Sequence, residues 1–337
     1  MKEAMLWDAA EGKKVKCKLC NHRCLIPDGG TGFCLVRKNE GGKLYSLVYG
    51  KAISWEVDPI EKKPFFHWFP GTQAFSFATV GCNFRCEGCQ NWMISQTREI
   101  AGKEMPPDEI IRTAKGFGAK GLAYTYTEPT IFFEYAYDTA ALGKKEHLYS
   151  VFVTNGYMTP EAIKEMKNID ASRIDLKFMD EKLYNKYCSV RGYEHVLESI
   201  KLLHKKGHVE VINLVIPTLN DNDDAYRATA EFIAGMDKET PLHFIAFYPA
   251  NRAMEIPPTA VKALERAREI GLEEGLDYVY IGNIPGHPGE NTYCPKCKEP
   301  LIERYGFTIT KYSITKDHKC PKCGRKILIW DETNYEL

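Results

Sequence analysis

The sequence predicts an α/β protein built as a partial or full (β/α) barrel, with small cysteine-rich metal modules at its N-terminal and C-terminal ends. From about residue 73, short apolar runs alternate with helical segments. Such runs are typical of parallel strands buried on both faces, and strict alternation of strand and helix indicates a parallel sheet with helical crossovers. The order of elements does not separate a closed barrel from a partial one or from a doubly wound sheet, so these alternatives stay open.

The alternation can be followed along the chain. Strands are expected at 75–80, 122–126, 149–154, 173–178, 209–216, 243–248 and 278–281. Helices are expected at 107–117, 130–142, 160–168, 194–206, 223–235 and 259–274. We therefore predict an N-terminal four-cysteine module and lead-in over 1–72, a barrel core over 73–290 and a C-terminal zinc-ribbon-like module over 291–337.

Composition and charge exclude several classes of protein. Lysine and arginine number 45, as do aspartate and glutamate, so the net charge is zero. Without a block of basic residues, the sequence argues against a nucleic-acid or anionic-membrane surface. No apolar run approaches the roughly 18 residues that a membrane-spanning helix needs. The first 14 residues carry charges of both signs and no apolar signal region, so we expect a cytoplasmic protein.

Eleven of the twelve cysteines fall into three close groups, and Cys188 stands apart. Close pairs in a long intracellular chain indicate metal sites rather than disulfides. The groups are Cys17, Cys20, Cys24 and Cys34; Cys82, Cys86 and Cys89; and Cys294, Cys297, Cys320 and Cys323.

The central group has the spacing Cys-x3-Cys-x2-Cys and follows the first expected strand directly. Three thiolates on one loop can bind three irons of a cubane cluster, which usually takes a fourth cysteine. No cysteine follows until Cys188, so the fourth iron would stay open to a substrate or cofactor. Loops after strand ends form the active face of β/α barrels. The alternative is a structural zinc site completed by a distant histidine.

This motif resembles the signature of the radical S-adenosylmethionine (SAM) superfamily. The flanking Asn83-Phe-Arg-Cys and Gln90-Asn91 are similar to activating enzymes of glycyl-radical proteins, such as pyruvate formate-lyase activase. The whole chain, both outer modules included, resembles the radical SAM member of the AmmeMemoRadiSam system. The resemblance implies a barrel of the radical SAM type, SAM as a cofactor, and a catalytic [4Fe–4S] cluster held by Cys82, Cys86 and Cys89.

Further similarities fall on expected strand ends. Thr127-Glu128-Pro129 resembles the Gly-Gly-Glu-Pro that holds the ammonium of SAM, with Tyr126 and Thr127 in place of the glycines. Thr154-Asn155-Gly156 and Asp175-Leu176-Lys177 are similar to motifs of the activases, and Asn213 is a candidate ribose contact. The resemblance thus implies these SAM-binding residues: Tyr126, Thr127, Glu128, Asn155, Asp175, Lys177 and Asn213.

Each of these residues also has a structural interpretation. Glu128 before a proline can be an ordinary loop carboxylate. Asp175 and Lys177 point to the same face of their strand, so they can form a structural ion pair, although buried charges are costly unless paired or functional. Asn155 and Asn213 can be hydrogen-bonded interior amides. The chain also departs from the activases, because Gly88 replaces an aromatic residue before the third cysteine.

The two outer groups suit metals held by four sulfurs. In the C-terminal group, two Cys-x2-Cys pairs flank a strand-like stretch, Tyr305 to Ile314. This predicts a knuckle–hairpin–knuckle arrangement, as in zinc ribbons. Zinc is the prediction there, with a rubredoxin-like iron or an auxiliary cluster as the alternative. The N-terminal group can hold zinc or an auxiliary [4Fe–4S] cluster.

The predicted reaction is reductive cleavage of SAM to a 5′-deoxyadenosyl radical, which abstracts hydrogen from a protein, peptide or small substrate, as in the activases. One alternative is modification of a metabolite or a tRNA base, although the neutral net charge argues against a tRNA substrate. Another is a non-catalytic scaffold, organised by its metals, that binds a partner. The resemblance implies partners of the Memo and AMMECR1 types and an electron donor such as ferredoxin or flavodoxin.

Overall fold

The computed structural model describes residues 1–337 and divides into two compact units. Unit 1 comprises Met1–Asp58, Gln73–Ser172 and Tyr184–His208. Unit 2 comprises Pro59–Thr72, Arg173–Leu183 and Val209–Leu337. The division follows contacts in space rather than chain order, so it neither confirms nor contradicts the three consecutive segments predicted above.

The central element is an eight-stranded sheet whose order from β8 to β16 follows the chain. The pairs β9–β11, β11–β12, β14–β15 and β15–β16 are parallel. A doubly wound sheet would reverse its strand order at a switch point, and this one does not. Because β8 and β16 are the two edges, the sheet is open, as in a partial rather than a closed barrel. Its strands are β8 (Ser54–Pro59), β9 (Gln73–Ala78), β11 (Gly121–Tyr124), β12 (Tyr149–Thr154), β13 (Ala171–Asp175), β14 (His208–Val215), β15 (Leu242–Ala246) and β16 (Val279–Gly282).

The predicted strands and helices are confirmed, with ends that shift by a few residues. The edge strand β8 was not predicted, because it is half-exposed and lacks an apolar run. Helix α4 begins at Pro160, and the side chain of Thr159 caps it by accepting from the backbone N–H of Ala162. The main helices are α2 (Pro107–Gly116), α3 (Phe133–Lys145), α4 (Pro160–Glu165), α6 (Glu194–His204), α7 (Asp223–Met236) and α8 (Val261–Glu273). The short elements are α1 (Trp92–Ser95), α5 (Glu181–Leu183), β7 (Lys51–Ala52) and β10 (Lys103–Glu104). No helix combines the length and the apolar character that crossing a membrane requires.

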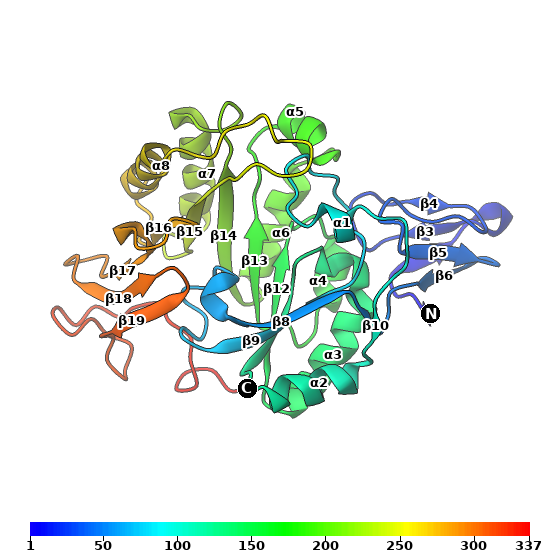
Figure 1. Ribbon diagram of the computed structural model, residues 1–337, viewed down its shortest axis with the longest axis horizontal. Helices are drawn as coiled ribbons and strands as arrows, with labels where there is room; N and C mark the ends of the chain where they lie inside the picture. The colour runs from blue at the N-terminus through cyan, green and yellow to red at the C-terminus, as the bar shows by residue number, and fades with distance from the viewer. The chain divides into compact units, whose positions relative to one another are not determined.

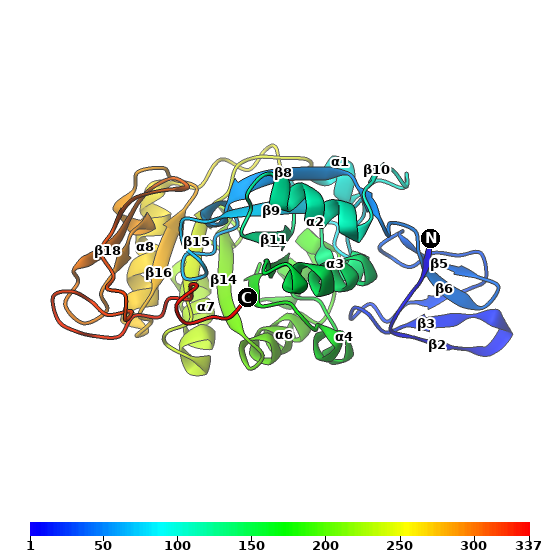
Figure 2. The same ribbon diagram turned by 90° about the horizontal axis from the view of Figure 1, so that it is seen from below.

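Unit 1 joins two small N-terminal sheets to the first half of the large sheet. Helices α2 and α3 pack on each other, and α3 also contacts β11 and β12 (Figure 2). The N-terminal strands, blue in Figure 1, form the orders β1-β6-β5 and β2-β3-β4. Their bounds are β1 (Lys2–Glu3), β2 (Trp7–Ala9), β3 (Val15–Cys17), β4 (Leu25–Ile26), β5 (Arg37–Glu40) and β6 (Lys43–Ser46).

A buried ion pair fastens the N-terminal sheets to α3. Arg37 Nη1 donates to both carboxylate oxygens of Glu134, at 2.8 and 3.0 Å, and both side chains are almost fully buried. The backbone N–H of Met5 donates to the same carboxylate at 2.7 Å. These contacts therefore tie the N-terminal sheets to α3 within unit 1.

In unit 2 a buried carboxylate on β14 holds the lead-in segment before β9. Glu210 accepts from the backbone N–H groups of Phe66 and His67, at 3.0 and 2.9 Å, and lies 2.7 Å from His243 Nε2. The C-terminal strands β17 (Thr292–Tyr293), β18 (Pro300–Tyr305) and β19 (Thr308–Tyr312) form a further sheet. The hairpin predicted between the two Cys-x2-Cys pairs is confirmed, because β18 and β19 pair antiparallel. It begins earlier than Tyr305, and the chain turns at Gly306 (φ +58°) between the two strands.

Replacing Glu134 by glutamine would leave the buried guanidinium of Arg37 without its counter-charge. We expect a loss of about 3–5 kcal/mol in the free energy of unfolding, because an unpaired buried charge is costly. Urea denaturation followed by tryptophan fluorescence measures it. The matched control is Glu146→Gln, which breaks the solvent-exposed pair with Lys115 and should leave the midpoint unchanged. Equal shifts in the two variants would contradict this account.

Candidate active site and metal centres

The central cysteine loop starts at Gly81, just after β9, and carries Cys82, Cys86 and Cys89. These three thiols are half-buried and interact electrostatically with one another. The backbone N–H of Phe84 donates to Cys82 Sγ at 3.3 Å. Burial raises the pKa of Cys82 well above its ordinary value, and the nearby carboxylate of Glu128 adds to that rise. A cationic metal centre would reverse this effect by stabilising the thiolates.

A π-helical turn, Tyr184–Cys188, clamps this loop. The carbonyl groups of Tyr187 and Cys188 accept from the backbone N–H groups of Glu87 and Arg85, each at 2.9 Å. Single π-helical turns are rare and often occur at functional sites. Sequence reasoning missed this contact because about a hundred residues separate its two sides and no local pattern marks it.

Glu128 follows β11, is buried, and accepts hydrogen bonds from several donors. Its Oε1 accepts from the backbone N–H and the hydroxyl of Thr130, at 3.0 and 2.6 Å, and from the hydroxyl of Thr154 at 2.6 Å. Its Oε2 accepts from the backbone N–H of Asn155 at 2.8 Å. Burial raises the pKa of this carboxyl, and these hydrogen bonds oppose the rise. Glu128 therefore joins the ends of β11 and β12 and keeps capacity at Oε2.

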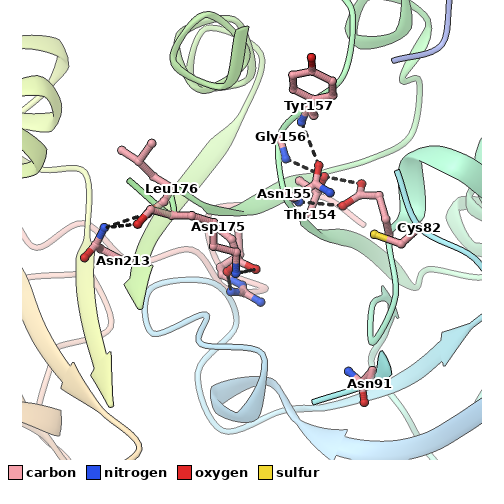
Figure 3. A network of polar contacts seen from close by, with 12 residues as sticks. Cys82, Asn91, Thr154, Asn155, Gly156, Tyr157, Asp175, Leu176 and Asn213 are labelled. Carbon is pink, nitrogen blue, oxygen red and sulfur yellow. Dashed lines mark hydrogen bonds and ion pairs between the residues drawn. The ribbon is translucent and has the colours of Figure 1, made fainter. Parts of the chain in front are cut away.

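Asn155 joins this arrangement to the cysteine loop. Its Nδ2 donates to Asn83 Oδ1 at 2.7 Å. Its Oδ1 accepts from the backbone N–H of Tyr157 at 3.0 Å (Figure 3). Asn83, next to Cys82, is fully buried, and its own Nδ2 has no hydrogen-bond partner. Asn83 is a site residue that the sequence did not single out, although it stood within the quoted motif.

Tyr126 and Thr127 tie β11 to the neighbouring segments. Tyr126 has a φ of +61°, which is strained for a residue with a side chain. Its hydroxyl donates to Asp58 at 2.6 Å, and its carbonyl accepts from Asn91 Nδ2 at 2.7 Å. The hydroxyl of Thr127 donates to the carbonyl of Thr79 at 2.9 Å. These bonds hold the strained turn beside the loop.

The other predicted residues lie in unit 2. Asp175, at the end of β13, pairs with Lys177 at 3.0 Å and with Arg173, a partner that the sequence did not indicate (Figure 3). Burial acts to raise the pKa of Asp175, but the two cations outweigh it and the pKa is lowered. The carboxylate is therefore held in its charged form. A structural role for these ion pairs does not conflict with the predicted contact to SAM, because Arg173, Asp175 and Lys177 together carry a net positive charge.

Asn213, on β14, is a buried amide that bridges two strands. Its Nδ2 donates to the carbonyl of Leu176 at 2.9 Å, and its Oδ1 lies 3.3 Å from Asn220 Nδ2. Asn220 also bonds the backbone around it, because its Oδ1 accepts from Ile216 at 2.7 Å. This arrangement gives Asn213 an interior role; its contact with a ribose stays a prediction.

Comparisons with known proteins agree with this arrangement. A model of the radical SAM superfamily matches residues 77–233. An uncharacterized protein of Methanocaldococcus jannaschii is 46% identical over 332 residues, which cover 97% of this chain and 99% of that protein. The chain contains a radical SAM domain. The matched residues contain the cysteine loop, Glu128, Asn155, Asp175 and Asn213.

Two further proteins are similar to parts of this chain. Pyruvate formate-lyase 1-activating enzyme of Escherichia coli K12 is 23% identical over 187 residues, which cover 53% of this chain and 75% of the enzyme. Streptococcus suis SuiB bound to S-adenosylmethionine matches with a TM-score of 0.50 at 14% identity, over 63% of this chain and 52% of SuiB. The second likeness concerns the fold alone.

The residues of unit 1 fit the groups that a radical SAM protein binds. Three thiols on one loop suit three irons of a [4Fe–4S] cluster. A buried donor without a protein partner, Asn83 Nδ2, lies beside Cys82 and suits an acceptor atom of a bound group. Glu128 offers spare acceptor capacity for an ammonium. Which residues contact SAM stays a prediction for all seven candidates.

The C-terminal group forms a compact cluster of four thiols in unit 2. The Sγ atoms of Cys294, Cys297, Cys320 and Cys323 all lie within 4.8 Å of one another. Two of the Sγ–Sγ distances are 3.5 Å, for Cys294 and Cys323, and 3.6 Å, for Cys297 and Cys320. A tetrahedral ion with bonds of about 2.3 Å places its sulfurs about 3.8 Å apart. The residues thus fit a single metal ion.

Glu128→Gln tests whether this carboxylate organises the site. The amide would bring an NH2 group toward donors of Thr130, Thr154 and Asn155, so we expect a loss of about 3 kcal/mol in unfolding free energy. Thermal denaturation by circular dichroism measures the shift. Glu99→Gln, an exposed position in the same segment, is the matched control and should not change the midpoint. A midpoint at the wild-type value for Glu128→Gln would refute the proposed linkage.

Proposed function

We propose that this radical SAM protein is an enzyme that cleaves SAM reductively at a [4Fe–4S] cluster on Cys82, Cys86 and Cys89. The observation that carries the proposal is the set of three thiols on one loop at the end of a parallel strand, with no fourth cysteine in that loop. When bound, the cluster and SAM supply a 5′-deoxyadenosyl radical that abstracts hydrogen from a substrate carbon.

The chain's own residues orient and shield these groups. Glu128 and Asn155 hold the ends of β11 and β12 against the cysteine loop, which limits movement of the thiols. Asn83 Nδ2 is a buried donor available to a bound acceptor. In unit 2, Lys177 and Arg173 give the Asp175 cluster its excess positive charge, which suits the carboxylate of SAM.

The substrate we propose is a protein or peptide, as for the activases. The likeness to the E. coli activating enzyme supports this class. Trp92 and Met93 support it too, because they follow the cysteine loop directly and their side chains are 45% and 68% exposed. Exposed apolar side chains of this kind suit a macromolecular surface. We further propose Memo-type and AMMECR1-type partners, and a ferredoxin or flavodoxin as the electron donor.

Cys86→Ala tests the assignment of the cluster. We expect the variant to fold, to lose iron from this loop, and to release no 5′-deoxyadenosine from SAM when reduced under anaerobic conditions, because two thiols cannot hold the cluster open for SAM. Product is quantified by chromatography. Cys188→Ala is the matched control for iron content, since alanine keeps the backbone carbonyl that Arg85 contacts. SAM cleavage at the wild-type rate in Cys86→Ala would overturn the proposal.

We propose zinc as the metal of the C-terminal group, since four thiols at these distances suit tetrahedral zinc. Cys294 and Cys320 are buried within a core cluster that includes Phe66, Tyr278 and Tyr280. The ion therefore stabilises the packing of the lead-in segment as well as the C-terminal strands.

Cys297→Ser should remove about one zinc per chain, because three thiols remain of the four that a structural zinc site uses. We also expect a lower thermal midpoint. Atomic emission spectroscopy and calorimetry measure the two effects. Thr310→Ala, in the adjoining strand β19, should change neither; unchanged zinc content in Cys297→Ser would place the ion elsewhere.

A further inference from the structure

The N-terminal thiols differ from the C-terminal ones in their surroundings. They line a cavity in unit 1, and Cys17, Cys20 and Cys34 are buried. The rest of the cavity wall is almost entirely apolar: Leu19, Ile26, Gly32, Phe33 and Ile131, with Arg37 as its charged member. The backbone N–H of Phe33 donates to Cys24 Sγ at 3.5 Å. The four cysteines thus line one small cavity whose remaining wall is largely apolar.

From this arrangement we infer that Cys17, Cys20, Cys24 and Cys34 hold a second [4Fe–4S] cluster, which passes one electron to the cluster on Cys82, Cys86 and Cys89. A cubane carries its own sulfide and needs a dry, sulfur-lined space, and its potential depends on hydrogen bonds to its sulfurs. A tetrahedral zinc ion needs only converging thiolates, which the C-terminal group provides.

Arg37 supports an anionic, hydrogen-bond-accepting occupant. Its side chain is 1% exposed, and its Nε has no hydrogen-bond partner, although Nη1 and Nη2 are bonded to Glu134 and Met5. Buried donors are almost always satisfied. Because Arg37 lines the thiol cavity, a thiolate or sulfide of the cluster would satisfy that donor and would be stabilised by the guanidinium.

The N-terminal thiols lie directly against the central cysteine loop. His22 Nε2, two residues after Cys20, lies 2.7 Å from the carbonyl of Asn83, which follows Cys82. Gly81 leaves no room between the two segments, since a Cβ on it would come within 2.9 Å of the Cys34 carbonyl. Gly81 also has a φ of +95°, which favours glycine.

Arg85 bridges the two sets of thiols. Its Nη1 donates to the carbonyl of Cys82 at 2.7 Å, and its Nη2 donates to the carbonyl of Phe33 at 2.6 Å. Its guanidinium stacks over the Phe33 ring, 4.6 Å from the centroid, and interacts electrostatically with Cys34 as well as with Cys82. One cation thus lies between two anionic centres, where it reduces their repulsion and connects them through short hydrogen bonds.

The transfer step balances as a one-electron exchange. A low-potential one-electron donor protein reduces the N-terminal cluster and is itself oxidised. The reduced cluster then gives that electron to the oxidised cluster of the central loop and returns to its oxidised form; no bond is made or broken. This electron transfer rests on the proposed function, because its acceptor is the central cluster. The presence of the N-terminal cluster does not depend on the proposed function.

The test compares three proteins reconstituted anaerobically with iron and sulfide: the full chain, a variant with Cys82→Ala, Cys86→Ala and Cys89→Ala, and a variant with Cys17→Ser and Cys20→Ser. We expect about eight irons and eight sulfides in the full chain and about four of each in either variant, since each cubane holds four. Cys188→Ala is the matched control and should keep about eight.

The electron exchange has its own readout. In the fully reduced wild-type protein, the electron paramagnetic resonance spectrum should be broadened by magnetic interaction between two neighbouring clusters. It should therefore differ from the sum of the two variants' spectra. A spectrum equal to that sum would overturn the exchange.

The iron counts separate the possible failures. If the triple variant holds no iron and two zincs, the second cluster is refuted and the proposed function stands. If it keeps all the iron of the wild type, the central loop holds no cluster and the proposed function falls. The double serine variant covers the case in which the triple variant does not fold, because its loss of half the iron supports the same assignment and an unchanged iron content refutes it.

Discussion

Unit 1 depends on the buried carboxylate of Glu128, which accepts hydrogen bonds from both sides of the gap between two strand ends. A buried charge is tolerated when donors surround it, and here Thr130, Thr154 and Asn155 supply them. Asn155 then carries the connection on to Asn83 and the cysteine loop. The cysteine loop is therefore held by this chain of polar contacts as well as by the π-helical turn.

Parallel strands explain why these residues meet. The carboxyl ends of successive strands lie at one edge of the sheet, so segments separated by many residues become neighbours there. The cysteine loop follows β9, Glu128 follows β11 and Asn155 follows β12. In unit 2 the same rule places Asp175 at the end of β13. In each unit the residues proposed for the cluster or for SAM therefore lie at or near strand ends.

Buried charged side chains hold the N-terminal sheets and the lead-in segment in place. Arg37 and Glu134 join the N-terminal sheets to α3, and Glu210 holds the lead-in segment in unit 2. Pairs of this kind add little net stability but penalise alternative arrangements, because each charge needs its own partner. The same Arg37 lines the N-terminal thiol cavity, so one guanidinium both secures that module and charges the space among its cysteines.

Sequence alone determined the strand and helix order, the three cysteine groups and the motifs at strand ends, because apolar periodicity and metal-ligand spacing are local properties of a chain. It could not predict that Asn83 meets Asn155, that Arg173 joins Asp175, or that Arg85 lies between two sets of thiols. Those contacts depend on which backbone carbonyls and side chains meet across the fold. Only the tertiary structure showed that the sheet is open, because the pairing of strands across the fold is not encoded in any local sequence pattern.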